Sequence, residues 1–563
     1  MSEKTVYENA SQRKTYVGRV FDMGERQKKK EILDSLPAEW AELHRDGHIH
    51  IHDLDAYGLT YNCLTFNLLN KFPYRDFIGL SDNRKILGLF EYYKNIVSKV
   101  GNEQSGGMGF ANFDNDTAEI LTNMSVKITQ SNLDFITDCI AEFILWCNGS
   151  HERMGQVSYY VTLNIGLAKN DLARHVCRSV ISEFYNSPDK VFKPNIVFKV
   201  KKGINHDKGD RNRDLLEESL LCTAKKMIPT YILCDCESNR DIDPELLSIM
   251  GCRTRVVKDI YGHTGSRGRG NICNISINLP RLALETINES SEGNIIARFK
   301  EKWLRVAETT KDILIHRYTE TLKMEKSDFP TVNKYDLWIE DFSKNNTLED
   351  IFKHGTLSIG FIGISEAFEI LTGKKYYSDP IIYQNALDFV KFMRSYTDSC
   401  TEKYKLNFSL LATSGELISG RFCEIDQKLY DSPVMQKGYY TNSFHVDVDS
   451  GLSAIEKIGK EGPFHSICNG GCITYIELNE APLGNKEGLL ELIDCAIQSG
   501  THYLGVNFPL DICNDCGEKG VFDTCPGCGS GSITRVRRVS GYLEILDYFV
   551  SGKKAEVAHR RSN

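Results

Sequence analysis

Four cysteines near the C-terminal end of the sequence are spaced as metal ligands. Cys513 and Cys516 form one Cys-x2-Cys pair, and Cys525 and Cys528 form a second pair eight residues later. Thiolates at this spacing suit a tetrahedral Zn²⁺ ion, and a closed set of four sulfurs leaves no position for substrate. An iron–sulfur cluster is the competing interpretation. The short, ribbon-like layout favours structural zinc.

Three other cysteines could carry redox chemistry. Cys63 follows Asn62, Cys252 follows Gly251 in a Met-Gly-Cys-Arg-Thr run, and Cys273 ends an Asn-Ile-Cys run. The chain has 18 cysteines, and no secretory signal precedes them. They should therefore be reduced thiols, metal ligands or catalytic groups rather than a disulfide framework. A cysteine after a glycine is most often structural, so spacing alone does not identify the reactive thiol.

Gly541 lies in the run Arg-Val-Ser-Gly-Tyr-Leu, shortly after the last of the paired cysteines. This run is similar to the one around the radical-storing glycine of glycyl radical enzymes. Glycine suits that role because its Cα radical can lie flat and delocalise into the amide nitrogen and the carbonyl. The alternative is a turn glycine that supplies a positive φ. The metal ligands just before Gly541 favour a loop held on a scaffold.

Helices alternate with short strands along most of the chain. Apolar residues at helical spacing predict helices at about 84–100, 131–147, 214–228, 294–324 and 380–405. The runs 157–165 and 272–279 between them are rich in β-formers. This alternation favours an α/β fold, of which a large barrel is one form.

Composition divides the chain into three parts. Residues 1–45 form a polar lead-in, residues 46–510 form the large α/β domain, and residues 511–563 are rich in cysteine and glycine. The last part is too short for an apolar core of its own, so we expect a bound metal to stabilise its fold.

The overall charge and hydropathy exclude two classes of partner. The formal net charge is −8, which argues against nucleic acid and against a zinc-ribbon nucleic-acid binder, the alternative from a different class. The chain has no run of about 18 apolar residues, the length that suggests a membrane span. Its polar N-terminus lacks a signal-peptide core. We therefore expect a cytoplasmic protein.

Short motifs follow one another in a specific order along most of the chain. They occupy residues 47–55, 62–63, 250–254, 278–281, 411–413 with Glu416, 440–445, 513–528 and 538–543. Each motif is weak alone. Their shared order resembles the large catalytic subunit of the anaerobic, class III ribonucleoside-triphosphate reductases, which are glycyl radical enzymes.

The resemblance implies a ten-stranded α/β barrel with Cys252 at the tip of a central finger loop. Gly541 would enter the same barrel, and a radical-SAM activase with a four-iron, four-sulfur cluster would install its radical. Cys252 would then become a thiyl radical that takes the 3′ hydrogen of the ribose. Cys63 would donate the proton when the 2′ hydroxyl leaves as water.

The source of the reducing electrons stays open within this resemblance. The Asn-Ile-Cys run is similar to a strand of the aerobic reductases that carries a second redox cysteine, which favours a Cys63–Cys273 disulfide reduced by a redoxin. Alternatively, Cys273 faces the barrel wall, Asn271 or Asn274 lines the pocket, and formate is the reductant. A shift of one residue in strand register exchanges these faces. A formate-lyase type of glycyl radical enzyme is the remaining rival.

Nucleotide binding rests on weaker signals. Thr441, Asn442 and Ser443 form a compact polar run that could cradle a substrate phosphate, or be an ordinary loop. The resemblance implies a homodimer with a dNTP or ATP effector site at its interface, near the Gly-rich run 104–110. The core motif at 52–53 leaves no room for a preceding ATP-binding domain, so no shut-off by dATP through such a domain is expected.

Two further groups are expected to be structural. Cys468 and Cys472 flank a Gly-Gly bend and are interpreted as packing residues. His48, His50 and His52 alternate along a strand and superficially suggest a metal site, but we expect most of them to support the strand that presents Cys63.

Overall fold

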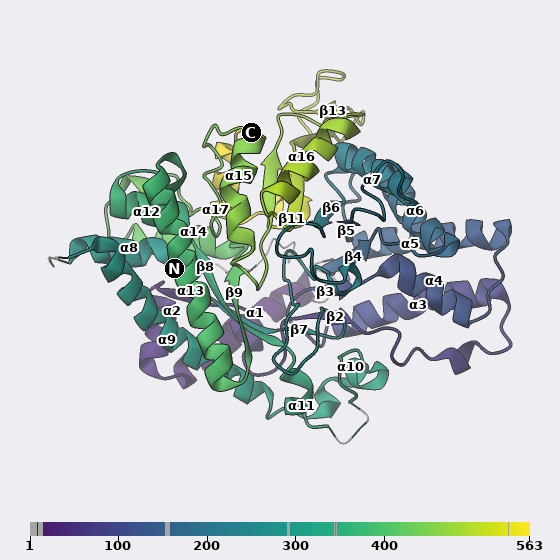
Figure 1. Cartoon of the computed structure of the whole chain (residues 1–563), viewed down its shortest axis with the longest axis horizontal. Helices are drawn as coiled ribbons and strands as arrows, with labels where there is room; N and C mark the ends of the chain where they lie inside the picture. Colours follow the sequence, from purple (N-terminus) through teal and green to yellow (C-terminus); the bar gives the residue numbers. More distant parts are fainter. Residues whose placement is uncertain are drawn as a thin grey trace.

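The computed structural model of the chain has an α/β architecture (Figure 1). It describes residues 8, 15–151, 158–289, 293–342, 344, 346–538 and 540–563.

One large sheet runs through the centre of the molecule. Ten strands follow the order β10-β11-β6-β5-β4-β3-β2-β7-β8-β9, and a short eleventh strand, β1, pairs with β7. These strands are β1 (Ile49–Ile51), β2 (Cys63–Phe66), β3 (Met108–Phe110), β4 (Val161–Ile165), β5 (Asn195–Val200), β6 (Thr230–Leu233), β7 (Gly270–Asn278), β8 (Thr356–Ile362), β9 (Asn407–Ala412), β10 (Thr474–Glu477) and β11 (Tyr503–Asn507).

The sheet closes into a barrel from two halves. Strands β2 to β6 are parallel to one another, as are β7 to β9 and the pair β10–β11. The halves meet antiparallel where β2 pairs with β7 and where β6 pairs with β11. A bridge between Leu411 in β9 and Gly471, just before β10, completes the circle. The predicted ten-stranded α/β barrel is confirmed.

Helices cover the barrel on both sides of the strands in Figure 1. They are α1 (Tyr16–Ser35), α2 (Ala38–Arg45), α3 (Asp82–Val100), α4 (Phe113–Asn123), α5 (Gln130–Asn148), α6 (Asp171–Asn186), α7 (Arg213–Lys226), α8 (Leu279–Asn288), α9 (Ile295–Thr321), α10 (Pro330–Tyr335), α11 (Leu348–Phe352), α12 (Ile364–Thr372), α13 (Pro380–Tyr404), α14 (Glu416–Asp426), α15 (Ala454–His465), α16 (Lys486–Gln498) and α17 (Ser551–His559). The five predicted helices are α3, α5, α7, α9 and α13. Each buries one apolar face, as α3 does with Ile86, Leu89 and Tyr93.

The chain between β6 and β7 enters the barrel as a finger loop. Asn164 in β4 holds this loop, because its side-chain amide donates to the Ile249 carbonyl and its oxygen accepts from the Ile249 N–H, both at 2.9 Å. A Cβ built at Gly107 would lie 2.4 Å from the Gly251 Cα, so a glycine is needed where the two segments cross. Cys252 follows Gly251 at the tip.

A second sheet forms near the C-terminus from four antiparallel strands in the order β13-β12-β14-β15. They are β12 (Leu510–Cys513), β13 (Lys519–Gly520), β14 (Ile533–Arg538) and β15 (Leu543–Ile545). Gly541 lies in the turn between β14 and β15. The sheet begins close to the predicted boundary at 511, while the three-part division itself stays a prediction.

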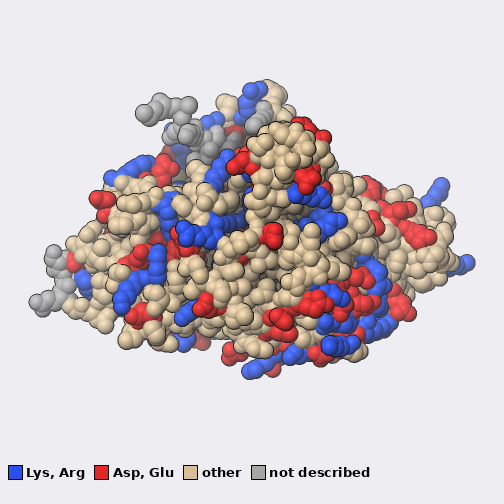
Figure 2. All heavy atoms as spheres, turned by 90° about the horizontal axis from the view of Figure 1, so that it is seen from above, with Lys and Arg blue, Asp and Glu red and all other residues tan. Residues whose placement is uncertain are grey.

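The surface agrees with the charge of the sequence. On the face shown in Figure 2, basic and acidic side chains are interspersed rather than gathered into a basic stripe. Among the helices of the described residues, none combines the length and the apolar character that a membrane crossing requires.

Candidate active site

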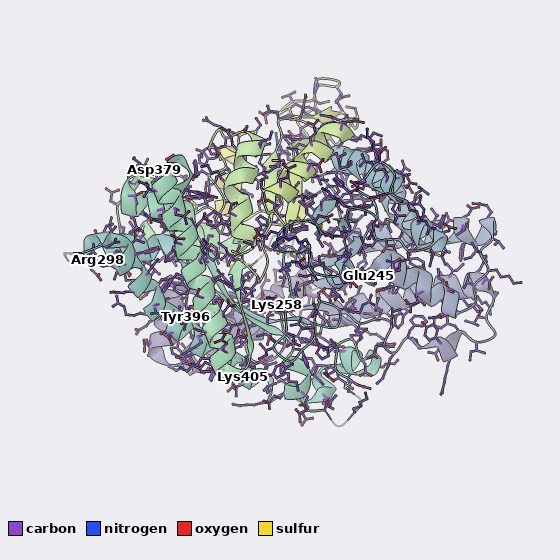
Figure 3. The ribbon with its side chains drawn as sticks, in the orientation of Figure 1. Glu245, Lys258, Arg298, Asp379, Tyr396 and Lys405 are labelled. Atoms are coloured by element: carbon purple, nitrogen blue, oxygen red, sulfur yellow. The ribbon has the colours of Figure 1, made fainter. Side chains whose placement is uncertain are left out.

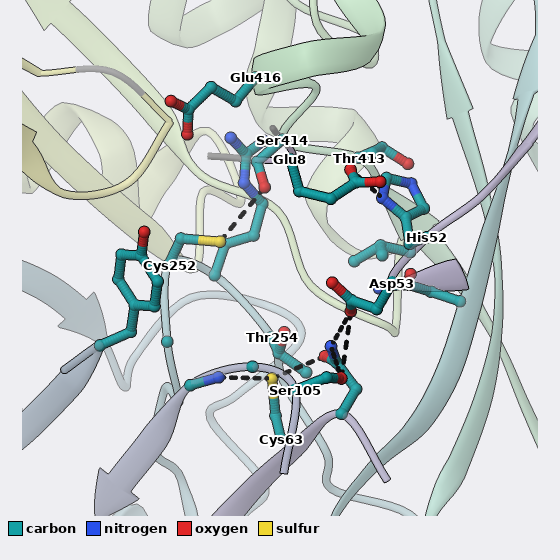
Figure 4. Close-up of a pocket in the computed structure, with 18 of the residues that line it drawn as sticks. Glu8, His52, Asp53, Cys63, Ser105, Cys252, Thr254, Thr413, Ser414 and Glu416 are labelled. Carbon is teal, nitrogen blue, oxygen red and sulfur yellow. Dashed lines mark hydrogen bonds and ion pairs between the residues drawn. The ribbon is translucent and has the colours of Figure 1, made fainter. Parts of the chain in front are cut away.

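A cavity lies inside the barrel around the tip of the finger loop (Figure 4). Its lining includes Glu8, His52, Asp53, Asn62, Cys63, Ser105, Gly106, Gly107, Tyr160, Cys252, Thr254, Asn274, Thr413, Ser414, Glu416 and Tyr542. Among the described residues, Cys63 and Cys252 are the cysteines that line it.

Gly541 and Cys252 are in direct contact. Gly541 has φ +145°, and a Cβ built there would lie 2.3 Å from the Cβ of Cys252. No other residue type fits, because the clash is with the Cys252 side chain and backbone rather than with a flexible tip. The Cys252 sulfur lies 3.2 Å from the Ser414 hydroxyl on the cavity wall. The two residues that the sequence singled out from opposite ends of the chain therefore meet.

Two buried arginines hold the peptides on either side of the Gly541 Cα. Arg253 Nη2 donates to the Ser540 carbonyl at 2.9 Å, and Arg538 Nη1 donates to the Gly541 carbonyl at 3.4 Å. Arg538 is fixed in turn by Asn507, whose Oδ1 accepts from Nε at 2.6 Å. Both arginines are 1% exposed, and burial lowers the pKa of Arg538. Sequence reasoning missed these contacts, although both arginines lie inside the motifs at 250–254 and 538–543.

Tyr542 ties the glycine loop to the cavity wall. Its hydroxyl donates to Glu416 Oε2 at 2.6 Å, and its ring lies 5.0 Å from the ring of Tyr160. Burial and then the charge of Glu416 raise the pKa of Tyr542, so the phenol stays a hydrogen-bond donor. Glu416 had been noted as a motif residue without a role.

Cys63 lies in the cavity lining on β2, in a separate set of contacts. Its sulfur accepts from the Gly107 N–H at 3.2 Å and donates to Asn62 Oδ1 at 2.8 Å. Asn62 Nδ2 donates to Asp53 Oδ2 at 2.7 Å. Burial raises the pKa of Cys63 well above its usual range, which keeps it a thiol. A protonated sulfur in a polar corner can donate a proton to a group in the cavity.

The four C-terminal cysteines converge at one end of the second sheet. The sulfurs of Cys513 and Cys528 are 3.6 Å apart, those of Cys516 and Cys525 are 3.5 Å apart, and all four lie within 4.8 Å of one another. A tetrahedral ion with Zn–S bonds of about 2.3 Å separates its sulfurs by about 3.8 Å. The donor set and its spacing fit a tetrahedral thiolate-bound metal.

Comparison with known proteins decides the family. The model of the anaerobic ribonucleoside-triphosphate reductase family matches residues 8–562. The chain belongs to this family. It is 30% identical to the enzyme of that name from Escherichia coli (strain K12), over 93% of this chain and 78% of the relative. It is 27% identical to that of Enterobacteria phage T4, over 93% of this chain and 91% of the relative.

Solved structures show the same fold. The anaerobic ribonucleotide reductase from Thermotoga maritima in complex with dATP and CTP matches with a TM-score of 0.69 at 15% identity, over 96% of this chain and 90% of that one. Hydroxyproline dehydratase from Clostridioides difficile matches with a TM-score of 0.62 at 11% identity, over 98% of this chain and 86% of that one. The family match sets aside the formate-lyase and nucleic-acid-binding alternatives, and the reductase is an oxidoreductase.

The placement of Cys273 does not favour the predicted Cys63–Cys273 pair, which stays a prediction. Cys273 is 1% exposed and its sulfur lies 3.9 Å from the Leu314 carbonyl of α9, on the outer face of β7. The next residue, Asn274, lines the cavity. A register shift in the β7–β8 pairing between Asn271 and Cys273 marks a bulge, and a bulge changes the face of the residues after it.

The run 104–110 borders the cavity, and its expected place near an effector site stays a prediction. Ser105, Gly106 and Gly107 line it, and a Cβ built at Gly106 would lie 2.8 Å from the Cys63 sulfur. Gly106 is therefore explained by its close approach to Asn62 and Cys63, and Gly107 by its crossing with Gly251.

Thr441, Asn442 and Ser443 lie outside the cavity lining. The N–H and the hydroxyl of Thr441 both donate to Glu366 Oε1, at 2.8 and 2.7 Å. Asn442 Oδ1 and Ser443 Oγ are buried without a hydrogen-bond partner among the described residues. Asn442 lies beside Gly415, which precedes the first residue of α14.

The alternating histidines have mainly structural contacts. His48 lies 2.7 Å from Glu285, and His52 lies 2.8 Å from the Ser276 hydroxyl. His50 contacts Glu8 at 2.8 Å, and burial lowers its pKa to about 4. Glu8, like His52, lines the cavity, and no pattern in the sequence had pointed to this glutamate.

The pair at the Gly-Gly bend is buried away from the cavity lining. Both Cys468 and Cys472 are fully buried, and the Cys472 sulfur lies 3.7 Å from His502 Nε2. The interpretation of both as packing residues agrees with this placement.

Proposed function

We propose that this reductase converts ribonucleoside triphosphates to 2′-deoxyribonucleotides through a radical that Gly541 stores and Cys252 uses. The contact between these residues carries the proposal. Hydrogen transfer from the Cys252 thiol to the Gly541 Cα needs no intervening group, and the sulfur faces the cavity. The Cys252 thiyl then takes the 3′ hydrogen of the ribose.

The hydrogen bonds to the peptides around Gly541 support the same role. A Cα radical is delocalised into the flanking amide and carbonyl, so Arg538, which donates to the Gly541 carbonyl, holds the peptide flat and favours negative charge on its oxygen. Arg253 fixes the preceding peptide through Ser540. We propose both arginines as positioning residues.

Cys63 is proposed as the acid for the departing 2′ hydroxyl. Its thiol is protonated and lines the cavity, as Cys252 does. The proton passes from the Cys63 sulfur to the leaving oxygen, and water departs. The thiol is oriented by its hydrogen bond to Asn62, which is held in turn by Asp53.

Formate is the reductant that the geometry favours. Cys273 lies on the wrong face to form a disulfide with Cys63, while Asn274 places an amide in the lining. One formate and one proton supply the two electrons and the hydrogen, so that R–OH becomes R–H with release of carbon dioxide and water. In this mechanism Cys63 acts without a second cysteine and forms no disulfide.

Electron paramagnetic resonance and product analysis test this proposal. Anaerobic reconstitution with a radical-SAM activase should give a glycyl doublet in the wild type and in Cys252→Ser, and none in Gly541→Ala. Turnover should require Cys252 and release labelled carbon dioxide from labelled formate. A doublet that survives in Gly541→Ala refutes the radical assignment, and turnover with a redoxin but without formate refutes the choice of reductant.

The remaining assignments follow from the family. We propose that Cys513, Cys516, Cys525 and Cys528 hold structural Zn²⁺ that anchors the loop of Gly541. We also propose a homodimer whose interface binds dNTP or ATP effectors. Analytical ultracentrifugation with and without dATP tests the dimer, and metal analysis of the purified chain tests the zinc.

The polar run before α14 is proposed to bind substrate phosphate. Ser443 offers a buried, unpartnered hydroxyl that can donate to a phosphate oxygen, and the adjacent Asn442 lies beside Gly415 at the N-terminus of α14, where backbone N–H groups favour an anion. Thr441 positions the run through Glu366. Asn442→Ala should raise KM for the nucleotide more than it lowers kcat.

A further inference from the structure

A second cluster of metal-ligand residues lies outside the cavity and away from the four cysteines. It comprises His263, where the finger loop returns toward β7, Glu340, and His354 just before β8, with Asp259 behind them. Glu340 Oε1 lies 3.5 Å from His354 Nε2 and 3.6 Å from His263 Nε2. Asp259, His263 and His354 also offer ligand atoms within 4.8 Å of one another. Lys258, labelled in Figure 3, immediately precedes Asp259.

The hydrogen bonds of His354 fix its free nitrogen. Nδ1 donates to Asp259 Oδ2 at 2.6 Å, and the other oxygen of Asp259 is held by Asn407 at 3.0 Å and by the Tyr261 N–H at 3.1 Å. With Nδ1 protonated, the lone pair of a neutral imidazole lies on Nε2. His354 is 1% exposed, and its Nε2 has no hydrogen-bond partner in the part of the chain that the structure describes.

An unpartnered buried nitrogen needs an explanation, because leaving it unpaired costs about 1–3 kcal/mol. Metal-bound histidines almost always donate their second ring N–H to a carboxylate, as His354 does to Asp259. Asp259 is itself held by Asn407 and by the Tyr261 N–H, so it fixes the orientation of the His354 ring.

Two of the three ligand separations are close to those around a first-row divalent metal. Bonds of about 2.0–2.1 Å in a tetrahedron separate ligand atoms by about 3.3–3.4 Å. The two measured separations are 3.5 and 3.6 Å. The side chains of His263 and Glu340 are 38% and 37% exposed, so the metal can enter from solvent and keep a water as its fourth ligand.

We propose that His263, Glu340 and His354 bind a divalent metal, with Zn²⁺ the best match to a His-His-Glu donor set. The metal joins the part of the finger loop that returns toward β7 to the segment that leads into β8. Arg269 already links the same parts, since it donates to the carbonyls of Val257 and His354. The site braces the base of the loop that carries Cys252.

Metal analysis of the desalted full chain tests the proposal. We expect two zinc equivalents in the wild type and one in Glu340→Gln or His263→Ala. The matched control is His206→Ala, because both nitrogens of His206 already contact carboxylates, at 2.9 Å from Asp207 and 2.7 Å from Asp494. This control should retain two equivalents. Glu340→Gln keeps the size of a half-exposed side chain, so the fold should survive, and circular dichroism checks it.

Cobalt distinguishes the two sites in one protein. Co²⁺ at the four cysteines gives intense sulfur charge-transfer bands, and Co²⁺ at the proposed site gives weaker visible bands only. A thiol-blocking mercurial should remove the first set and leave the second, which Glu340→Gln abolishes. One zinc equivalent in the wild type, a second equivalent that persists in Glu340→Gln, or binding that needs millimolar metal would each overturn the proposal. The proposal would also be overturned if no metal is bound and His354 is found as an imidazolium between Asp259 and Glu340.

Discussion

Cys252 and Cys63 face one cavity from two different kinds of support. Cys252 lies on a loop tip, against a glycine from a second loop, and that second loop is held by the side chains of Arg253, Arg538 and Tyr542. Cys63 begins strand β2, and its sulfur is held by a backbone N–H and by the adjacent Asn62. The side of the cavity proposed to carry the radical therefore depends on a few long-range contacts, whereas the side proposed to supply the acid is part of the sheet.

A third cysteine shows that burial does not make a thiol reactive. Cys273 lies on β7, which pairs with β2, and burial raises its pKa to about 12. The pKa of Cys63 is raised for the same reason. The two thiols differ in their access to the cavity, since Cys273 faces α9. Strand face, rather than pKa, separates the cysteine proposed as catalytic from the one that packs against α9.

The largest expected effect comes from replacing each of these two cysteines by alanine in turn. Cys63→Ala should lower kcat by about 10²–10⁴-fold, the usual contribution of a positioned acid. Cys273→Ala should leave kcat within about threefold of the wild type and destabilise the fold by about 1 kcal/mol. Turnover with formate measures kcat, and unfolding by denaturant measures the free energy of unfolding. An undamaged glycyl doublet in each variant is the control, and a severe loss of turnover in Cys273→Ala would restore the redoxin mechanism.

A smaller effect is expected on the radical side. Arg253→Met leaves the buried Ser540 carbonyl unpaired, which should destabilise the docked glycine loop by about 1–3 kcal/mol. Hydrogen exchange of residues 540–545 should speed up accordingly, and the yield of turnover per radical should fall. Arg535→Met is the matched control, because Arg535 is half-buried and its ion pair among the described residues is with the 98% exposed Asp523. If residues 540–545 are equally protected from hydrogen exchange in Arg253→Met and Arg535→Met, Arg253 does not hold the glycine loop.

The sequence could predict some of these features and not others. Helices α3 and α13 were foreseen within two residues at each end because their apolar residues repeat at helical spacing. The contact of Gly541 with Cys252 was foreseen through the resemblance of their motifs. The face of Cys273 was not, because the bulge after Asn271 is set by pairing with β8 and leaves no mark in the apolar pattern. The contact of Arg253 with Ser540 joins residues 287 positions apart, which no local pattern records.

The smallest expected effect is a flat response to alkaline pH. A cysteine in water loses its proton near pH 8.5, but burial places the pKa of Cys63 above that range in the folded protein. The acid form should therefore persist, and kcat should not fall between about pH 7.5 and 9.5 as it would if an exposed thiol were the acid. Alkylation of Cys63, followed by mass spectrometry, should likewise show no rise through pH 8.5. A loss of kcat with a midpoint near pH 8.5 that disappears in a Cys63 variant would mean that solvent reaches this thiol and that its sheet-bound corner opens during turnover.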